Sequence, residues 1–308
     1  MLAALIFLSS FLTLVELNCE NLFDTRHDVG KEDRDFVEGG SRHWTTARYW
    51  QKLNSIGKEI LSCSDELPDM VALCEVENDT VLHDLTRRSL LRNAGYEYLM
   101  TESPDLRGID VALLYRPSTL SVLCYDFLSV PPCTGMNSTR DILYVKGLTL
   151  SHDTIHIFVV HAPSRTSGEL ATRPFRMTVA NVVCEAIEQL HEDAKIILVG
   201  DFNDYVNSPA LKRYESLGLI NVSKNAKGRH GVGGTYRYKG YWQSLDHIFM
   251  SPSLSERVDT VYINDADFLL EKDDDYGCHR PFRTFNNKRT KRGGFSDHLP
   301  LVVRIRKK

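Results

Sequence analysis

Acidic, amide and histidine side chains recur in this sequence where apolar runs end. The clearest example is the run Ile196 to Val199, which is followed by Gly200 and then by Asp201 and Asn203. Four consecutive apolar residues are typical of a strand buried on both faces. Residues two apart on an extended chain point the same way, so the Asp201 carboxylate and the Asn203 amide share one direction. Because α/β sheets place their sites beyond strand ends, this pair predicts a functional site.

The same pattern predicts a larger constellation of polar side chains at strand ends. Its members are Asn18, Glu20, Glu75, His161, Asp201, Asn203, Asp246, Asp297 and His298. Carboxylate oxygens with few nitrogens suit Mg²⁺, with Mn²⁺ or Ca²⁺ as substitutes, better than Zn²⁺. Mg²⁺ uses one or two protein carboxylates and completes its shell with water and substrate phosphate. The set therefore predicts hydrolysis of a phosphate ester by metal-activated water.

Interspersed strands and helices must position these residues. The apolar spacing predicts helices over 46–62, 78–94 and 174–190. Strands are predicted at 13–19, 69–75, 96–100, 110–115, 119–124, 142–150, 154–161, 196–199, 245–251, 258–263 and 299–305. The connections between the central strands are too short for crossovers, so these strands should pair antiparallel. The pattern predicts a single α/β catalytic domain over 13–308.

Composition limits the class of protein. Of the 308 residues, 42% are hydrophobic and 25% charged, as in soluble globular proteins, and the net charge of −4 excludes a whole-surface attraction to polyanions. The seven cysteines form no CxxC pair, so we expect reduced thiols, which favour the cytoplasm. Residues 1–12 are apolar, consistent with the remnant of an export signal, and are too short to span a bilayer. The compartment and the oligomeric state stay open.

Seven blocks carry a resemblance to a known family. In order they are LNCENLFD (17–24), ALCEVEN (72–78), RGIDVALLYRP (107–117), VVHAPSR (159–165), GDFND (200–204), SLDHIFMS (244–251) and GGFSDHLPL (293–301). With these blocks the chain resembles the endonuclease/exonuclease/phosphatase superfamily, whose fold is that of deoxyribonuclease I. The resemblance implies a four-layer sandwich of two packed mixed β-sheets flanked by helices, with the active-site loops at one edge.

The resemblance also implies a role for each residue of the constellation. Glu75 would be the principal metal ligand, with Asn18, Asp297 and, in a second position, Glu20. Asp201 would orient or deprotonate the attacking water, and Asn203 would bind a phosphate oxygen. Asp246 would pair with His298, favouring the imidazolium that contacts the phosphate.

His161 separates subfamilies. Abasic-site nucleases place Asn at this position, whereas deoxyribonuclease I and sphingomyelinases have His, as here. Asp110 is the candidate partner of His161, and Arg140 falls where relatives carry a phosphate-contacting arginine.

Several hypotheses remain open from the sequence. The first is a Mg²⁺-dependent nuclease or phosphodiesterase, and the alternative is a phosphomonoesterase or a lipid or small-molecule phosphodiesterase. A non-catalytic binding module is the third. The basic segment 280–292 fits either a solvated loop or a phosphate-backbone contact. We assign Arg165 and Arg173 to the surface, with phosphate binding as the alternative. We assign Tyr236, Tyr238, Tyr241 and Trp242 to packing, with stacking on a base or sugar as the alternative.

Overall fold

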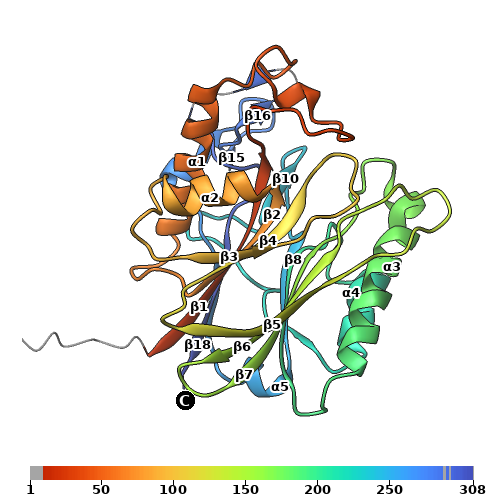
Figure 1. Cartoon of the computed structure of the whole chain (residues 1–308). Coiled ribbons are helices and arrows are strands. Elements are labelled where there is room, and N and C mark those ends of the chain that lie inside the picture. The colour runs from red at the N-terminus through yellow and green to blue at the C-terminus, as the bar shows by residue number, and fades with distance from the viewer. Residues whose placement is uncertain (1–9, 287–288, 291–292, 308) are drawn as a thin grey trace, which may run out of the picture.

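Two six-stranded β-sheets pack face to face in the computed structural model, and helices cover the outer face of each (Figure 1). The structure describes residues 10–286, 289–290 and 293–307. The first sheet has the order β13 (Val258–Ile263), β18 (Leu301–Arg306), β1 (Phe11–Leu22), β2 (Met70–Val76), β4 (Asp110–Tyr115) and β3 (Glu97–Met100). The second has the order β5 (Leu120–Leu128), β6 (Ile142–Thr149), β7 (Thr154–His161), β8 (Lys195–Asp201), β12 (Asp246–Met250) and β9 (Ile220–Asn221). Strands β1 and β2 run parallel, as do β7 and β8, so both sheets are mixed.

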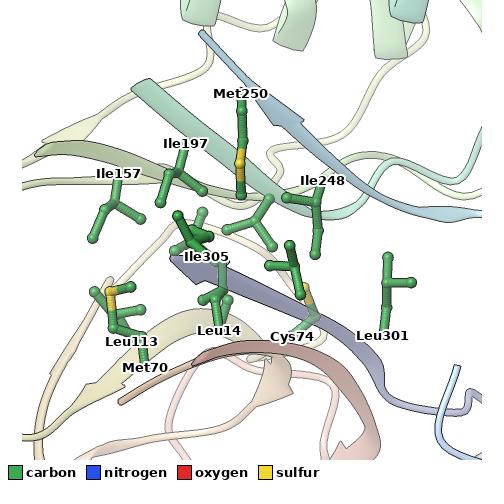
Figure 2. Packing of buried hydrophobic residues seen from close by; sticks show 14 of the residues in the cluster. Leu14, Met70, Cys74, Leu113, Ile157, Ile197, Ile248, Met250, Leu301 and Ile305 are labelled. Atoms are coloured by element: carbon green, nitrogen blue, oxygen red, sulfur yellow. The ribbon is translucent and has the colours of Figure 1, made fainter. Parts of the chain in front are cut away.

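The layers follow from the burial of both faces of the central strands. On β1, Leu14 packs between the sheets, whereas Val15 and Leu17 face helices α1 (Thr46–Leu61) and α2 (Asp79–Arg87). Helices α3 (Glu169–Glu188) and α4 (Pro209–Glu215) cover the second sheet in the same way. Figure 2 shows side chains from both sheets meeting in the central layer. The structure thus has the predicted four layers.

Smaller elements lie outside the two main sheets and their four covering helices. They are α5 (Pro252–Ser255), the 3₁₀ turns Arg34–Phe36 and Asp267–Leu269, and three two-stranded sheets formed by β10 (Tyr236–Tyr238) with β11 (Tyr241–Gln243), β14 (Leu270–Lys272) with β15 (His279–Pro281), and β16 (Phe285–Asn286) with β17 (Arg289–Thr290). All seven cysteines are unpaired. Within the described residues, no helix is both long and apolar enough to cross a membrane.

Several boundaries differ from the sequence prediction, and three of them are instructive. Strand β1 begins at Phe11, so the last two residues of the apolar segment 1–12 belong to the sheet. Helix α2 ends at Arg87 instead of Ala94; Leu91 is buried after a turn, whereas Leu90 is exposed. Helix α3 begins at Glu169, five residues before Pro174. A proline there removes one helical N–H at an exposed turn, which a helix of this length tolerates.

Candidate active site

Strand ends from both sheets surround one cavity of about 820 Å³. It is lined by Asn18, Asn21, Glu75, Arg107, His161, Ser164, Arg165, Thr166, Glu169, Asp201, Asn203, Tyr205, Tyr236, Tyr238, Gln243, Leu245, Asp297 and His298. The convergence follows from topology, because parallel β7 and β8 end together at His161 and Asp201, and antiparallel β12 begins opposite at Asp246. Seven of the nine predicted residues line the cavity, Asp246 lies behind it, and Glu20 lies outside its lining.

Asp201 lies at the centre of a hydrogen-bond network. Its Oδ2 accepts from Asn18 Nδ2 of the other sheet at 3.1 Å and from Asn203 Nδ2 at 3.2 Å. Burial, followed by the neighbouring Asp246 carboxylate, raises the pKa of Asp201 to about 7. Asn203 also donates from Nδ2 to the Ala162 carbonyl at 3.0 Å. Both amide hydrogens of Asn203 therefore have protein acceptors, so this residue orients Asp201 and has no free N–H for the predicted phosphate contact.

His298 and Asp246 form the predicted pair, with Nδ1 and Oδ2 separated by 2.8 Å. Burial lowers the pKa of His298, but the Asp246 carboxylate outweighs burial and raises it well above its usual value. The imidazole is therefore protonated at neutral pH. Thr235 donates its hydroxyl to the same Asp246 oxygen, and the ring of Tyr236 lies 4.9 Å from the His298 ring.

Glu16 is a buried acid next to this pair that sequence reasoning missed. Burial raises the pKa of Glu16 well above its usual value, and the Asp246 and Asp201 carboxylates raise it further. At neutral pH the residue is a neutral acid beneath the site. Its signal in the sequence is a lone acid between Leu14 and Asn18, on the face of β1 that points into the central layer.

The pKa of His161 is shifted in the opposite direction from that of His298. Its Nε2 atom lies 3.7 Å from Asp201 Oδ2 and 3.9 Å from Glu75 Oε1. Burial lowers its pKa well below the usual value, and Arg140 and Arg107 lower it further. The predicted partnership with Asp110 is wrong, because the Asp110 carboxylate accepts from Thr101 and Ser103, and His161 Nδ1 has no partner among the described residues. A register offset of one residue turns Asp110 to the other face of its strand.

Two further predicted site residues do not line the cavity. The Glu20 carboxylate accepts from Arg283 Nε at 2.9 Å and from the Thr284 N–H at 2.6 Å, so it is engaged outside the cavity. Its partner Arg283 holds Asp297 at 3.0 Å, which makes Glu20 an indirect support of the site. Arg140 is buried and donates to Asp105 and to the Ala162 carbonyl, so it does not reach the cavity as a phosphate contact.

The remaining predicted ligands fit a hard divalent cation. Asn18, Glu75 and Asp297 all face the cavity with oxygen donors and no sulfur. Glu75 sits at a left-handed backbone position, with φ of 62°, where its Oε2 accepts the Asn21 N–H at 2.8 Å. Strained backbone of this kind clusters at functional sites. The oxygens of Asp201 and Asp246 also lie near a His298 nitrogen, but the ion pair between Asp246 and His298 accounts for that arrangement.

Two arginines, Arg107 and Arg165, line the walls of the cavity, although the sequence analysis did not place them in the site. Arg107 donates to Asn21 Oδ1 at 2.7 Å, next to Glu75. Arg165, which we assigned to the surface, lies over the Tyr205 ring at 4.2 Å and donates to Gln243 at 2.9 Å. Both arginines lie in blocks that carried the resemblance, which is the only signal that could have identified them.

Comparison with known proteins identifies the family. The model of the endonuclease/exonuclease/phosphatase family matches residues 13–307. The chain belongs to this family. Members of the endonuclease/exonuclease/phosphatase family hydrolyse phosphate esters, and the chain is a hydrolase of that class with the deoxyribonuclease I-like fold.

Solved structures of the family share the fold at low identity. A Bacteroides thetaiotaomicron endonuclease/exonuclease/phosphatase family protein is 18% identical with a TM-score of 0.63, covering 96% of this chain and 97% of its own. A mannosyl-6-phosphatase from the same organism is 19% identical with a TM-score of 0.62, covering 95% and 98%. TDP2 of D. rerio, complexed with a single-strand DNA product, is 16% identical with a TM-score of 0.52, covering 96% and 99%. No curated protein shows significant similarity to the chain.

Proposed function

We propose that this protein is a divalent-metal-dependent phosphoesterase acting on a small phosphoester, with Mg²⁺ as the preferred ion. The observation that carries the proposal is the cavity itself, in which a protonated His298 and a neutral His161 flank Asp201. Three oxygen-donor side chains, Asn18, Glu75 and Asp297, complete the ring around it. This set of polar groups matches water-driven cleavage of a P–O bond. Among the described residues, no Ser or Thr lining the cavity has a basic hydrogen-bond partner that would activate it as a nucleophile.

Each of these side chains has a separate role in the proposed hydrolysis. Asn18, Glu75 and Asp297 would hold a divalent cation, which would supply positive charge to the phosphate and lower the pKa of water. Asp201, with a pKa of about 7, orients the attacking water and accepts its proton. His298 donates its remaining Nε2–H to a phosphate oxygen and stabilises the charge that develops there. Neutral His161 offers a hydrogen bond from the opposite side without adding charge.

The positions of the arginines favour a small substrate over a nucleic acid bound along an extended basic surface. Arg107 and Arg165 line the cavity, enough to bind one phosphate and one further polar group. In the basic segment, Arg283 is paired with Glu20 and Asp297, and Arg280 with Glu271. The side chains of Lys288, Arg289, Lys291 and Arg292 lie outside what the structure describes. A monoester substrate is compatible with the mannosyl-6-phosphatase relative.

A nuclease is the second candidate, and one observation favours it. Tyr205 and Tyr238 line the cavity and are each about half exposed, at 40% and 51%, so a base can stack on them. The single-strand DNA product in the TDP2 structure is compatible with this candidate.

Hydrolysis assays decide between the candidates. The purified protein is given p-nitrophenyl phosphate, bis-p-nitrophenyl phosphate and plasmid DNA, each with Mg²⁺, with Mn²⁺ and with EDTA. We expect turnover of a small ester that EDTA abolishes and that Glu75→Gln lowers about 10³-fold or more. Cleavage of plasmid alone favours the nuclease, and an undiminished rate in Glu75→Gln removes the metal assignment.

A further inference from the structure

A second group of acids lies outside the cavity, in the loop that follows β1. Asp28, Asp33 and Glu77 each offer a carboxylate oxygen, and these oxygens all lie within 4.8 Å of one another. Asp33 and Glu77 are buried, and Asp28 is half-buried. Asp24 adds a fourth carboxyl nearby, since its backbone N–H donates to Glu77 Oε2 at 2.6 Å. None of these residues lines the active-site cavity.

The negative charge of this group is poorly balanced. Among the described residues its one ion-pair partner is His27, which contacts Asp33. Glu77 is 5% exposed, and its Oε1 atom has no hydrogen-bond partner among the described residues. A buried oxygen without a partner costs free energy unless a donor or a cation meets it.

We propose that Asp28, Asp33 and Glu77 form a second cation site, selective for Ca²⁺, that holds this loop in place. Calcium binds oxygen ligands at about 2.3–2.6 Å, so two ligands of one ion lie at most about 5.2 Å apart. One carboxylate oxygen of each residue meets that limit, and Glu77 also carries a buried oxygen with no hydrogen-bond partner among the described residues. Ca²⁺ accepts irregular geometry and six to eight ligands, whereas Mg²⁺ demands a near-ideal octahedron, so an irregular loop open on the Asp28 side suits Ca²⁺.

The position of the site gives it a structural role near the active site. Glu77 follows Glu75 by two residues, and its N–H donates to the Leu22 carbonyl at 3.2 Å, which ties the ends of β1 and β2 together. On the other side of the loop, Lys31 donates to the carbonyls of Ser103 and Asp105, next to Arg107. A cation bound here fixes the loop that supports both the Glu75 and the Arg107 walls of the cavity. This inference does not rest on the proposed function.

Calcium titration of the full chain tests the site. The protein carries Glu75→Gln, so that the active-site ligand set is removed, and it is stripped with EDTA and dialysed before CaCl₂ or MgCl₂ is added. At about 100 times the Kd we expect Ca²⁺ to raise Tm by roughly 5 °C, and calorimetry to give one site per chain. Adding Glu77→Gln or Asp28→Asn should abolish both effects.

The matched control is Glu32→Gln, which removes an exposed carboxylate from the same loop and should leave the calcium response unchanged. If Glu77→Gln does not fold, Asp28→Asn carries the test, because that side chain is only half-buried. A calcium response that survives in either site variant, or its absence in the Glu75→Gln parent, overturns the proposal. In that case Glu77 is a neutral acid that shares its proton with a neighbouring carboxylate.

Discussion

The Nδ1 atom of His298 lies 2.8 Å from Oδ2 of Asp246, in a contact that joins the two sheets. Asp246 opens β12 of the second sheet, and His298 lies three residues before β18 of the first. Asp246 is almost fully buried, at 1% exposure, so this carboxylate interacts with the imidazole through a medium of low polarity. The pair therefore keeps the imidazole charged at neutral pH and fixes which nitrogen faces the cavity.

Replacing Asp246 by Asn tests this relationship. The substitution removes the charge that raises the pKa of His298, so the imidazole should lose its proton at a lower pH. Because the proposed mechanism uses the protonated form of His298, kcat should fall about 10²-fold at pH 7 and the alkaline limb of the rate profile should move to lower pH. A pH–rate profile with a small chromogenic phosphoester measures both.

Two controls accompany that measurement. Thr235→Val removes only the hydroxyl that also donates to Asp246, so it should leave the alkaline limb near its original position. Circular dichroism and Tm establish that both variants are folded. An Asp246→Asn profile that coincides with that of the unsubstituted protein contradicts the role assigned to the pair.

Arg165 provides a prediction about substrate affinity. Its guanidinium lies over Tyr205 and donates to Gln243 at the wall of the cavity, so it should contact the part of the substrate beyond the scissile phosphate. Arg165→Met should raise KM about 10-fold or more for the best substrate, with little effect on kcat. Arg213→Met is the matched control, because Arg213 pairs with Glu188 at the C-terminal end of α3 and neither residue lines the cavity. Equal KM values for the two variants would exclude a binding role for Arg165.

The sequence predicted the fold and most of the cavity because strand ends combine two local signals. In β8, an apolar run and a following Asp201 are adjacent in the chain, and burial on both faces makes that run visible. The family blocks then placed seven cavity residues correctly without any knowledge of how the sheets pack. The ion pair between Asp246 and His298 could be predicted because both residues lie in such blocks.

The features that the sequence did not predict depend on contacts between residues far apart in the chain and on the register of strands. Glu20 reads as one more strand-end acid, and only the structure shows that Arg283, 263 positions later, occupies its carboxylate. Asp110 lies on the expected strand, yet a shift of one position turns its side chain away from His161. Arg165 resembles any loop arginine until the fold places Tyr205 beneath it.

Arg176 and Asp204 give a prediction about stability. The Arg176 Nε atom lies 3.0 Å from Asp204 Oδ2, and both side chains are about 1% exposed. Removing one partner of a buried ion pair leaves an uncompensated charge, so Arg176→Met should lower the free energy of unfolding by about 3 kcal/mol. Urea denaturation followed by circular dichroism measures this loss. A smaller loss in the double variant Arg176→Met/Asp204→Leu than in the single variant would show that the stranded Asp204 charge, and not the lost packing, causes the effect.

Glu59 on α1 should make the protein less stable as the pH rises. Both carboxylate oxygens are buried and have no hydrogen-bond partner among the described residues. Burial raises the pKa of Glu59 from 4.5 to about 8, against the opposing charge of Lys52. Between these two values the folded protein holds a proton that the unfolded chain has released, so unfolding becomes easier by up to about 1.4 kcal/mol for each pH unit. Below pH 4.5 both states are protonated, and above pH 8 both are ionised, so the slope from this residue vanishes outside the window.

The variant Glu59→Gln removes this titration and keeps the shape of the side chain. Its Tm relative to the unsubstituted protein should therefore rise steadily from pH 5 to pH 8, as measured by thermal unfolding in buffers of equal ionic strength. Glu66→Gln, at an exposed position shortly after the same helix, is the control and should give a constant difference. If the Glu59→Gln difference is also constant with pH, the Glu59 carboxyl ionises in the folded protein as it does in water, and Lys52 compensates its charge fully.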